Sequence, residues 1–119
     1  MKDDEHKLFG SFRHALHGLY VVVKTELSFR IQLAIGIMVL ILVVILPLML
    51  WQRIILILLV AAVLILEVIN SIFERMVDAF KPRLHPMVGE IKDIMAAAVL
   101  LASIVSAVIG ILLFWPYLF

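Results

Sequence analysis

The sequence contains no cysteine, and it carries little charge for its length. Without cysteine the chain can form no disulfide bond and perform no thiol chemistry. Charged residues make up 16% of the chain and hydrophobic residues 66%, against about 25% and about 45–50% in an average soluble domain. The net charge of +1 gives no indication of a nucleic-acid partner. At 119 residues the chain is long enough for one domain, and its composition is that of an integral membrane protein.

The two common phosphate-binding motifs of soluble proteins are also missing. The sequence has neither a G-x-x-x-x-G-K-[ST] loop nor a G-x-G-x-x-G turn. A nucleotide bound by this chain would therefore have to be held by a different architecture.

Three hydrophobic segments follow a mixed N-terminal region. Residues 31–50 are uncharged, residues 54–80 change from apolar to polar along their length, and residues 92–115 are again mostly apolar. Because a helix rises about 1.5 Å per residue, about 20 residues cross a hydrocarbon core of about 30 Å. Residues 1–30 place apolar side chains mostly three or four apart, which predicts an amphipathic helix at the membrane surface. We therefore predict an all-α integral membrane fold, with three transmembrane helices and this surface helix in one domain.

The basic residues predict the orientation of these spans. Of the 10 Lys and Arg residues, all except Arg53 would lie on one side of the membrane. Cytoplasmic segments carry the excess of basic residues in membrane proteins. We predict a cytoplasmic N-terminus and a C-terminus on the outside.

Four polar residues in the second span share one face of a helix. At about 100° per residue, Glu67, Asn70, Glu74 and Asp78 fall within a narrow sector roughly 80° wide. Ionisable groups inside a span are costly and usually face a partner or a functional cavity. Three carboxylates on one face need a cation, and Mg²⁺ prefers carboxylate oxygens while leaving positions open for phosphate.

The spacing alone leaves other interpretations open. The polar face could be a helix–helix interface in a structural membrane oligomer. It could also be the pathway of a small proton or cation transporter subunit, since such proteins place ionisable residues within their spans.

Two sequence blocks resemble a known family. Glu67-Val-Ile-Asn70-Ser71-Ile-Phe-Glu74-Arg-Met-Val77-Asp78 is similar to the E-x-x-N-[ST]-A-I-E-x-x-V-D signature of bacterial membrane-integral diacylglycerol and undecaprenol kinases. His85, Lys92-Asp93 and Ala96-Ala97-Ala98-Val99 resemble the H-x₆-K-D-x-x-[AGS]-A-A-V block of that family, and Thr25-Glu26-x-x-Phe29 sits where the family has similar residues. The resemblance covers nearly the whole chain.

The resemblance implies an ATP- and Mg²⁺-dependent lipid kinase of the bacterial cytoplasmic membrane, assembled as a homotrimer. It implies that Glu67 is the general base, that Glu26 and Glu74 hold the metal ions, and that Lys92 contacts the phosphates. The remaining predicted residues have nucleotide-binding or supporting roles: His85 and Asp93 at the nucleotide, and Asn70, Ser71 and Asp78 beside the substrate.

The acceptor lipid is predicted to be undecaprenol, with diacylglycerol as the alternative. The His85-Pro86 pair and the closing Phe114-x-Pro116 resemble the undecaprenol kinase branch more closely. A polyprenol offers only hydrocarbon beside its hydroxyl, whereas a diacylglycerol also carries ester carbonyls. The first helix and the start of the first span supply mostly hydrocarbon, through Leu16, Leu19, Val22, Val23, Leu27 and Ile31.

The predicted orientation can be tested with topology reporters. A reporter fused after Phe119 should be active outside the cytoplasm, and one inserted in residues 81–89 should be active inside. The reason is that nearly all basic residues are predicted to lie on the cytoplasmic side of the membrane. Reporter activity in whole cells measures both. A cytoplasmic C-terminal reporter would contradict the three-span prediction.

Overall fold

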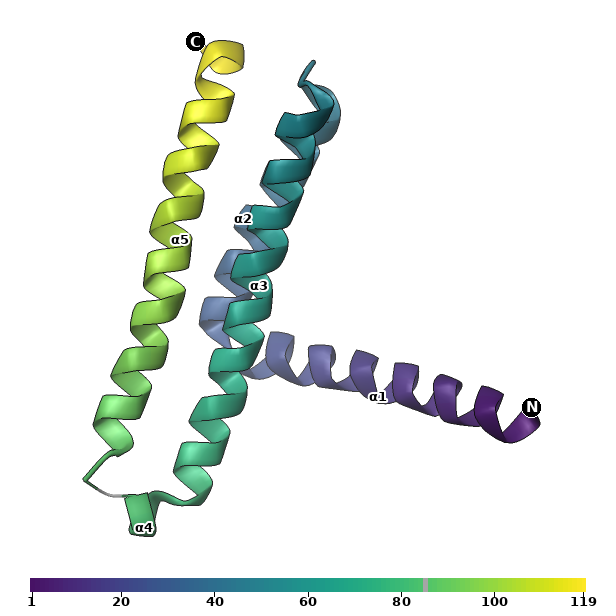
Figure 1. Cartoon of the computed structure of the whole chain (residues 1–119), viewed down its shortest axis with the longest axis vertical. Helices are drawn as coiled ribbons and strands as arrows, with labels where there is room; N and C mark the ends of the chain where they lie inside the picture. The colour runs from purple at the N-terminus through teal and green to yellow at the C-terminus, as the bar shows by residue number, and fades with distance from the viewer. Residues whose placement is uncertain (85) are drawn as a thin grey trace.

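Helices make up nearly all of the structure. The computed structural model describes residues 1–84 and 86–119, and Figure 1 shows their arrangement. In chain order the helices are α1 (Lys2–Thr25), α2 (Leu27–Ile45), α3 (Leu50–Ala79), α4 (Lys81–Leu84) and α5 (Val88–Leu118). The all-helical class is confirmed for this part of the chain.

Three of the helices in the described residues, α2, α3 and α5, are long and apolar enough to cross a membrane. This confirms the three predicted spans at the level of length and composition. The surface position of the N-terminal helix and the homotrimer remain predictions.

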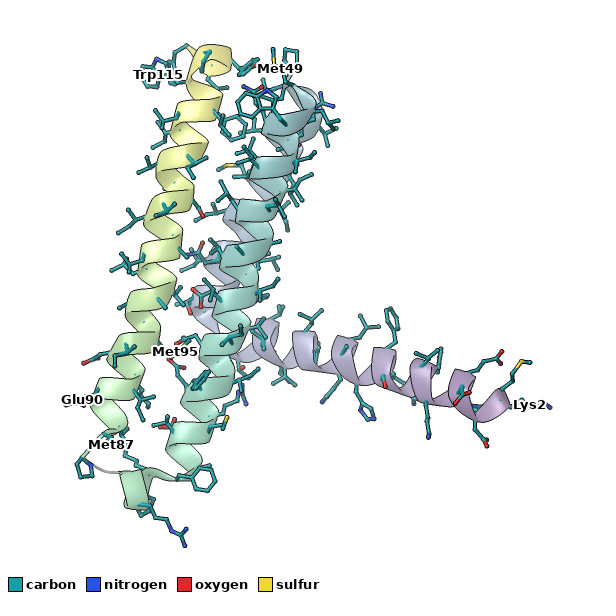
Figure 2. All side chains as sticks on the ribbon, viewed as in Figure 1. Lys2, Met49, Met87, Glu90, Met95 and Trp115 are labelled. Atoms are coloured by element: carbon teal, nitrogen blue, oxygen red, sulfur yellow. The ribbon has the colours of Figure 1, made fainter. Side chains whose placement is uncertain are left out.

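The central helix of the bundle is α3, which packs against both α2 and α5. The C-terminal end of α5 lies at the same end of the bundle as the α2–α3 connection, and α4 lies at the opposite end (Figure 1). Helix α1 contacts α2 and projects sideways from the half of the bundle nearer to α4. Figure 2 shows Met49 and Trp115 at one end of the bundle and Met87 and Glu90 at the other.

The first span ends earlier than the uncharged run because of Pro47. Proline forces the preceding residue away from helical geometry, and Leu46 is extended with φ −77° and ψ 148°. Helix α2 therefore stops at Ile45, and a short connector leads to α3. The Leu46 carbonyl accepts hydrogen bonds from Leu48 N at 2.8 Å and from Arg53 Nη2 at 3.2 Å, so Arg53 links the connector to the first turn of α3.

A small core and one shared amide hold this end of the bundle together. Val43, Leu48, Leu56 and Phe114 are buried against one another and so join α2, the connector, α3 and α5. Gln52 Oε1 accepts hydrogen bonds from the Met49 backbone N–H at 2.9 Å and from the Tyr117 hydroxyl at 2.8 Å. The Gln52 amide therefore accepts a backbone hydrogen bond at the start of α3 and also holds the end of α5 beside it.

An apolar cavity of about 630 Å³ lies between α2, α3 and α5. Its walls include Gly36, Val63 and Gly110, and Gln32 Nε2 donates a hydrogen bond to Ser103 Oγ at 3.2 Å between α2 and α5. Two small residues of α5, Ser106 and Gly110, also line this cavity. Helix α5 therefore contacts α3 without closing the space beside α2.

Helices α2 and α3 approach each other closely at Gly36. A Cβ atom at this position would lie 2.9 Å from Val60 Cγ1, which is too close for ordinary contact. Val60 is β-branched and has little rotamer freedom in a helix, so the backbones would have to separate.

We expect Gly36→Ala to destabilise the protein by about 1–3 kcal/mol, which is typical of overpacking a tight site. Denaturation of the purified protein in one detergent measures the loss. Gly10→Ala is the matched control, because a Cβ there meets nothing within 4 Å and should be neutral or slightly stabilising in a helix. Equal stability of the two variants would contradict the tight contact.

Candidate active site

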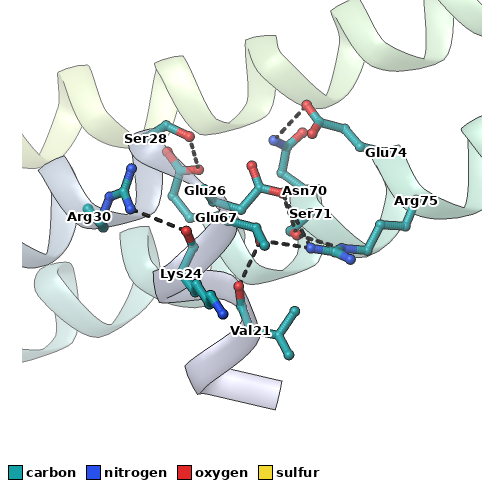
Figure 3. Close-up of polar contacts among 11 residues, drawn as sticks. Val21, Lys24, Glu26, Ser28, Arg30, Glu67, Asn70, Ser71, Glu74 and Arg75 are labelled. Atoms are coloured by element: carbon teal, nitrogen blue, oxygen red, sulfur yellow. Dashed lines mark hydrogen bonds and ion pairs between the residues drawn. The ribbon is translucent and has the colours of Figure 1, made fainter. Parts of the chain in front are cut away.

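The candidate site lies where the α1–α2 junction meets α3. A single residue, Glu26, separates the two helices, and its backbone is extended with φ −110° and ψ 109°. Arg30 Nη1 donates to the Lys24 carbonyl at 3.2 Å and so satisfies a carbonyl at the end of α1. The break places the Glu26 side chain against α3, as Figure 3 shows.

Glu67 is the most buried ionisable side chain of this group, with only 5% of its surface exposed. Ser28 Oγ donates a hydrogen bond to Glu67 Oε2 at 3.4 Å. Glu26 and Glu74 both lie close enough for their charges to repel that of Glu67. In residues 1–84 and 86–119 no cationic side chain forms an ion pair with Glu67. Burying an ionised carboxylate in these surroundings is unfavourable in free energy unless a cation or a proton compensates for its charge.

Glu26 is held by two residues of α3. Ser71 is buried, with 3% exposure, and its hydroxyl donates to Glu26 Oε1 at 3.0 Å. Arg75 Nη2 lies 3.9 Å from the same oxygen. The predicted supporting residue Ser71 thus contacts a predicted metal ligand directly.

Asn70 and Glu74 form the third part of the site. Asn70 Nδ2 donates to Glu74 Oε1 at 3.4 Å along one face of α3. The other amide atom, Asn70 Oδ1, is buried and has no hydrogen-bond partner among the described residues. An orphaned buried oxygen of this kind calls for a donor or a cation beside it.

Asp78 and Lys92 pair at the cytoplasmic end predicted for the site. Lys92 Nζ lies 2.7 Å from Asp78 Oδ1 and joins the end of α3 to the start of α5. Both side chains are substantially exposed, so this ion pair contributes little to stability. Lys92 also lies within electrostatic reach of Glu74, which connects the pair to the carboxylates.

One predicted residue stands apart from this arrangement, and another is not described by the structure. Asp93 is exposed and takes no part in the hydrogen bonds and ion pairs of the described structure. His85 lies outside the described residues, so its predicted contact with a nucleotide is not placed.

The oxygen atoms at the site fit a Mg²⁺ ion. No group of three His, Asp or Glu side chains in the described part of the chain is arranged to hold a metal ion by itself. Mg²⁺ does not require such a group, because it is usually bound by one or two carboxylates together with phosphate and water oxygens. Glu26, Glu74 and the unpartnered Asn70 Oδ1 supply suitable oxygens on neighbouring surfaces.

Three contacting residues were not among those predicted for the site. Ser28 contacts Glu67, and Arg75 donates from Nη2 to Thr25 Oγ1 at 2.9 Å and from Nε to Ser71 Oγ at 3.4 Å. The four-residue spacing of Ser71 and Arg75 could have indicated their contact, because such residues are neighbours on a helix. The contacts of Ser28 and Thr25 with α3 depend on how the helices pack, for which the sequence pattern gives no signal.

Comparisons with known proteins give one consistent result. A family described as prokaryotic diacylglycerol kinase matches residues 13–114. The chain is 32% identical over 117 residues to the undecaprenol kinase of Bacillus subtilis (strain 168), which covers 98% of this chain and 95% of that protein. It is 38% identical over 65 residues to the diacylglycerol kinases of Escherichia coli (strain K12) and Shigella flexneri, covering 55% of this chain and 53% of each of those proteins.

Proposed function

Because the chain belongs to the prokaryotic diacylglycerol kinase family, we propose that it is a lipid kinase that transfers the γ-phosphate of ATP to the hydroxyl of a membrane lipid. The names of its relatives, undecaprenol kinase and diacylglycerol kinase, support this reaction class. The observation that carries the proposal is the buried Glu67 beside two further carboxylates, where the α1–α2 junction meets α3 in an otherwise apolar bundle.

Glu67 is the proposed general base. Phosphoryl transfer requires positioning and charge neutralisation, together with a group that accepts the proton of the attacking hydroxyl. Glu67 is flanked along α3 by Val63, one helical turn away, which lines the apolar cavity. Hydrocarbon and carboxylate are thus adjacent, which suits an acceptor whose chain stays in the membrane and whose hydroxyl must reach a base.

Glu26 and Glu74 are the proposed ligands of Mg²⁺. When bound, the metal ion would neutralise charge on the phosphates and on the carboxylates that face them. Ser71 orients the Glu26 carboxylate, and the Asn70 amide orients Glu74 through Nδ2, which leaves the buried Oδ1 without a hydrogen-bond partner among the described residues.

Lys92, Asp93 and His85 are the proposed contacts of the nucleotide. Lys92 is already held near the carboxylates by Asp78, at the boundary between α3 and α5. Its ammonium group would meet the phosphates as a point charge. Asp93 follows directly and is exposed to solvent, where a soluble nucleotide could approach it.

The site would face the cytoplasm of a bacterium at the plasma membrane, with α1 lying on the membrane surface. Three spans leave part of the polar face of α3 open, since Asn70 and Glu74 are only half-buried. A homotrimer would cover these surfaces with neighbouring subunits and complete the site.

The Glu67→Gln variant tests the base. The change keeps the size and the hydrogen bond from Ser28 but removes the proton acceptor, so turnover should fall by about 10²–10⁴-fold. Transfer of labelled phosphate from ATP to lipid by the purified protein measures the loss. Glu90→Gln is the matched control, because this exposed carboxylate of α5 lies outside the proposed site. Retention of more than about a tenth of wild-type turnover by Glu67→Gln would assign the base elsewhere.

The acceptor is proposed to be undecaprenol. The relative that aligns over nearly the full length of both chains is an undecaprenol kinase, and the apolar cavity beside Glu67 offers few donors for ester carbonyls. We expect a higher kcat/KM for undecaprenol than for diacylglycerol in the same bilayer. An apolar pocket discriminates by only about 10–200-fold for small differences, so activity on both lipids is expected. A tenfold preference for diacylglycerol would reverse the choice of acceptor and leave the reaction class intact.

A further inference from the structure

We propose that Arg75 is a positioning residue that sets the direction of the Glu26 carboxylate by tying α3 to the break between α1 and α2. The inference rests on the proposed function, because it assigns Arg75 a part in preparing Glu26 for Mg²⁺. No role in the reaction follows for Arg75 from the sequence blocks, in which it stands at a variable position between Glu74 and Val77.

The break at Glu26 leaves this residue without the constraints of a continuous helix. Its backbone N–H still donates to the Val22 carbonyl at 2.9 Å, and its carbonyl accepts from Arg30 N at 3.2 Å. These bonds fix the backbone, but the extended φ and ψ turn the side chain out of both helices. The direction of the carboxylate is therefore decided by what it meets on α3.

Arg75 makes three contacts at this junction, all through its guanidinium group. Nη2 donates to Thr25 Oγ1 at 2.9 Å and lies 3.9 Å from Glu26 Oε1, and Nε donates to Ser71 Oγ at 3.4 Å. Thr25 and Glu26 belong to the junction, whereas Ser71 and Arg75 belong to α3. Figure 3 shows the guanidinium beside Ser71 and Glu26 at the point where the helices meet.

The donors and acceptors of this network have a fixed direction. A hydroxyl has one donor and two acceptor positions, and a guanidinium has donors only. Thr25 uses its donor on the Val21 carbonyl at 2.7 Å, and Ser71 uses its donor on Glu26. Both hydroxyls are therefore left as acceptors, and Arg75 is the group that supplies donors to both. The arrangement holds Ser71 in the rotamer in which its hydroxyl faces Glu26.

Apolar packing cannot replace these contacts. Val22 is the only residue of α1 that is buried, and Phe29 is buried at the start of α2. These two side chains keep the junction against the bundle, but they place no donor near a carboxylate. Loss of Arg75 would thus leave the fold assembled and Glu26 free to turn away from Glu74 and Glu67.

Residues that orient a metal ligand typically change metal affinity by about 10–100-fold when they are removed. We expect Arg75→Met to raise the Mg²⁺ concentration for half-maximal activity at least tenfold, with kcat at saturating Mg²⁺ near the wild-type value. Arg75→Lys should restore part of the loss, because an ammonium group keeps the charge but cannot reproduce the planar fork of donors. Arg83→Met, which removes an exposed cation from α4, is the matched control and should leave both parameters unchanged.

A second measurement does not depend on activity. Because the chain has no cysteine, Leu16→Cys in α1 and Phe80→Cys at the end of α3 can be spin-labelled without other changes, and both positions are exposed. Labelled protein diluted with unlabelled protein in nanodiscs reports the distance within one chain. Arg75→Met should broaden the distance distribution in the absence of ATP and metal, and Arg83→Met should not.

The outcomes separate this proposal from the function itself. If the wild-type protein transfers no phosphate to lipid, the proposed function fails, and the distance measurement still tests the link between α1 and α3. If Arg75→Met lowers only the melting temperature, with Mg²⁺ dependence and distances unchanged, Arg75 is merely structural and the proposal is overturned. Should Arg75→Met not fold, Thr25→Val removes one acceptor with little change of shape, and its Mg²⁺ dependence should shift in the same direction; no shift would overturn the proposal.

Discussion

A carboxylate placed at membrane depth has to find its partners within the protein, because hydrocarbon offers neither hydrogen bonds nor counterions. Glu67 is the residue on which this constraint acts most strongly. Its surroundings are a serine hydroxyl from α2 and two further carboxylates, which together leave its charge uncompensated. The rest of the site follows from this requirement, since a bundle that buries Glu67 needs a cation, a proton or a substrate beside it.

The α1–α2 break and helix α3 position the polar side chains around Glu67 in different ways. Helix α3 carries Glu67, Asn70 and Glu74 on one regular face, so their relative positions are fixed by the helix alone. Glu26 reaches the same region only because α1 and α2 are separated by one extended residue. The site thus combines a row of residues on one helix with a carboxylate, Glu26, that comes from the junction between two helices and contacts Ser71 and Arg75.

The helical period predicted which residues of α3 share a face, and hydropathy predicted the three spans, because both depend on local sequence. The break at Glu26 was not predicted: no glycine or proline lies there, and tertiary contacts from Arg30 and Ser71 stabilise it instead. Pro47 was visible in the sequence and accounts for the end of α2 at Ile45, whereas the contact of Arg53 with the Leu46 carbonyl depends on the path of the connector. The partners of Glu67 and Glu26 across the helices depend on how α2 packs against α3, including the close approach at Gly36. Such packing cannot be read from periodicity.

The two ends of the bundle are held by different kinds of interaction. The end near Phe114 contains an apolar core, and the Tyr117 hydroxyl donates a hydrogen bond to the Gln52 amide there. The end near Lys92 has an exposed ion pair between α3 and α5, together with the buried side chains of Val77 and Val88. Because α4 is a short helix that contacts mainly α3, its amide protons should exchange sooner than those at the start of α3. A molecule that entered between α3 and α5 at the Lys92 end would have to break the Lys92–Asp78 ion pair, whereas the buried contacts around Phe114 at the other end would stay in place.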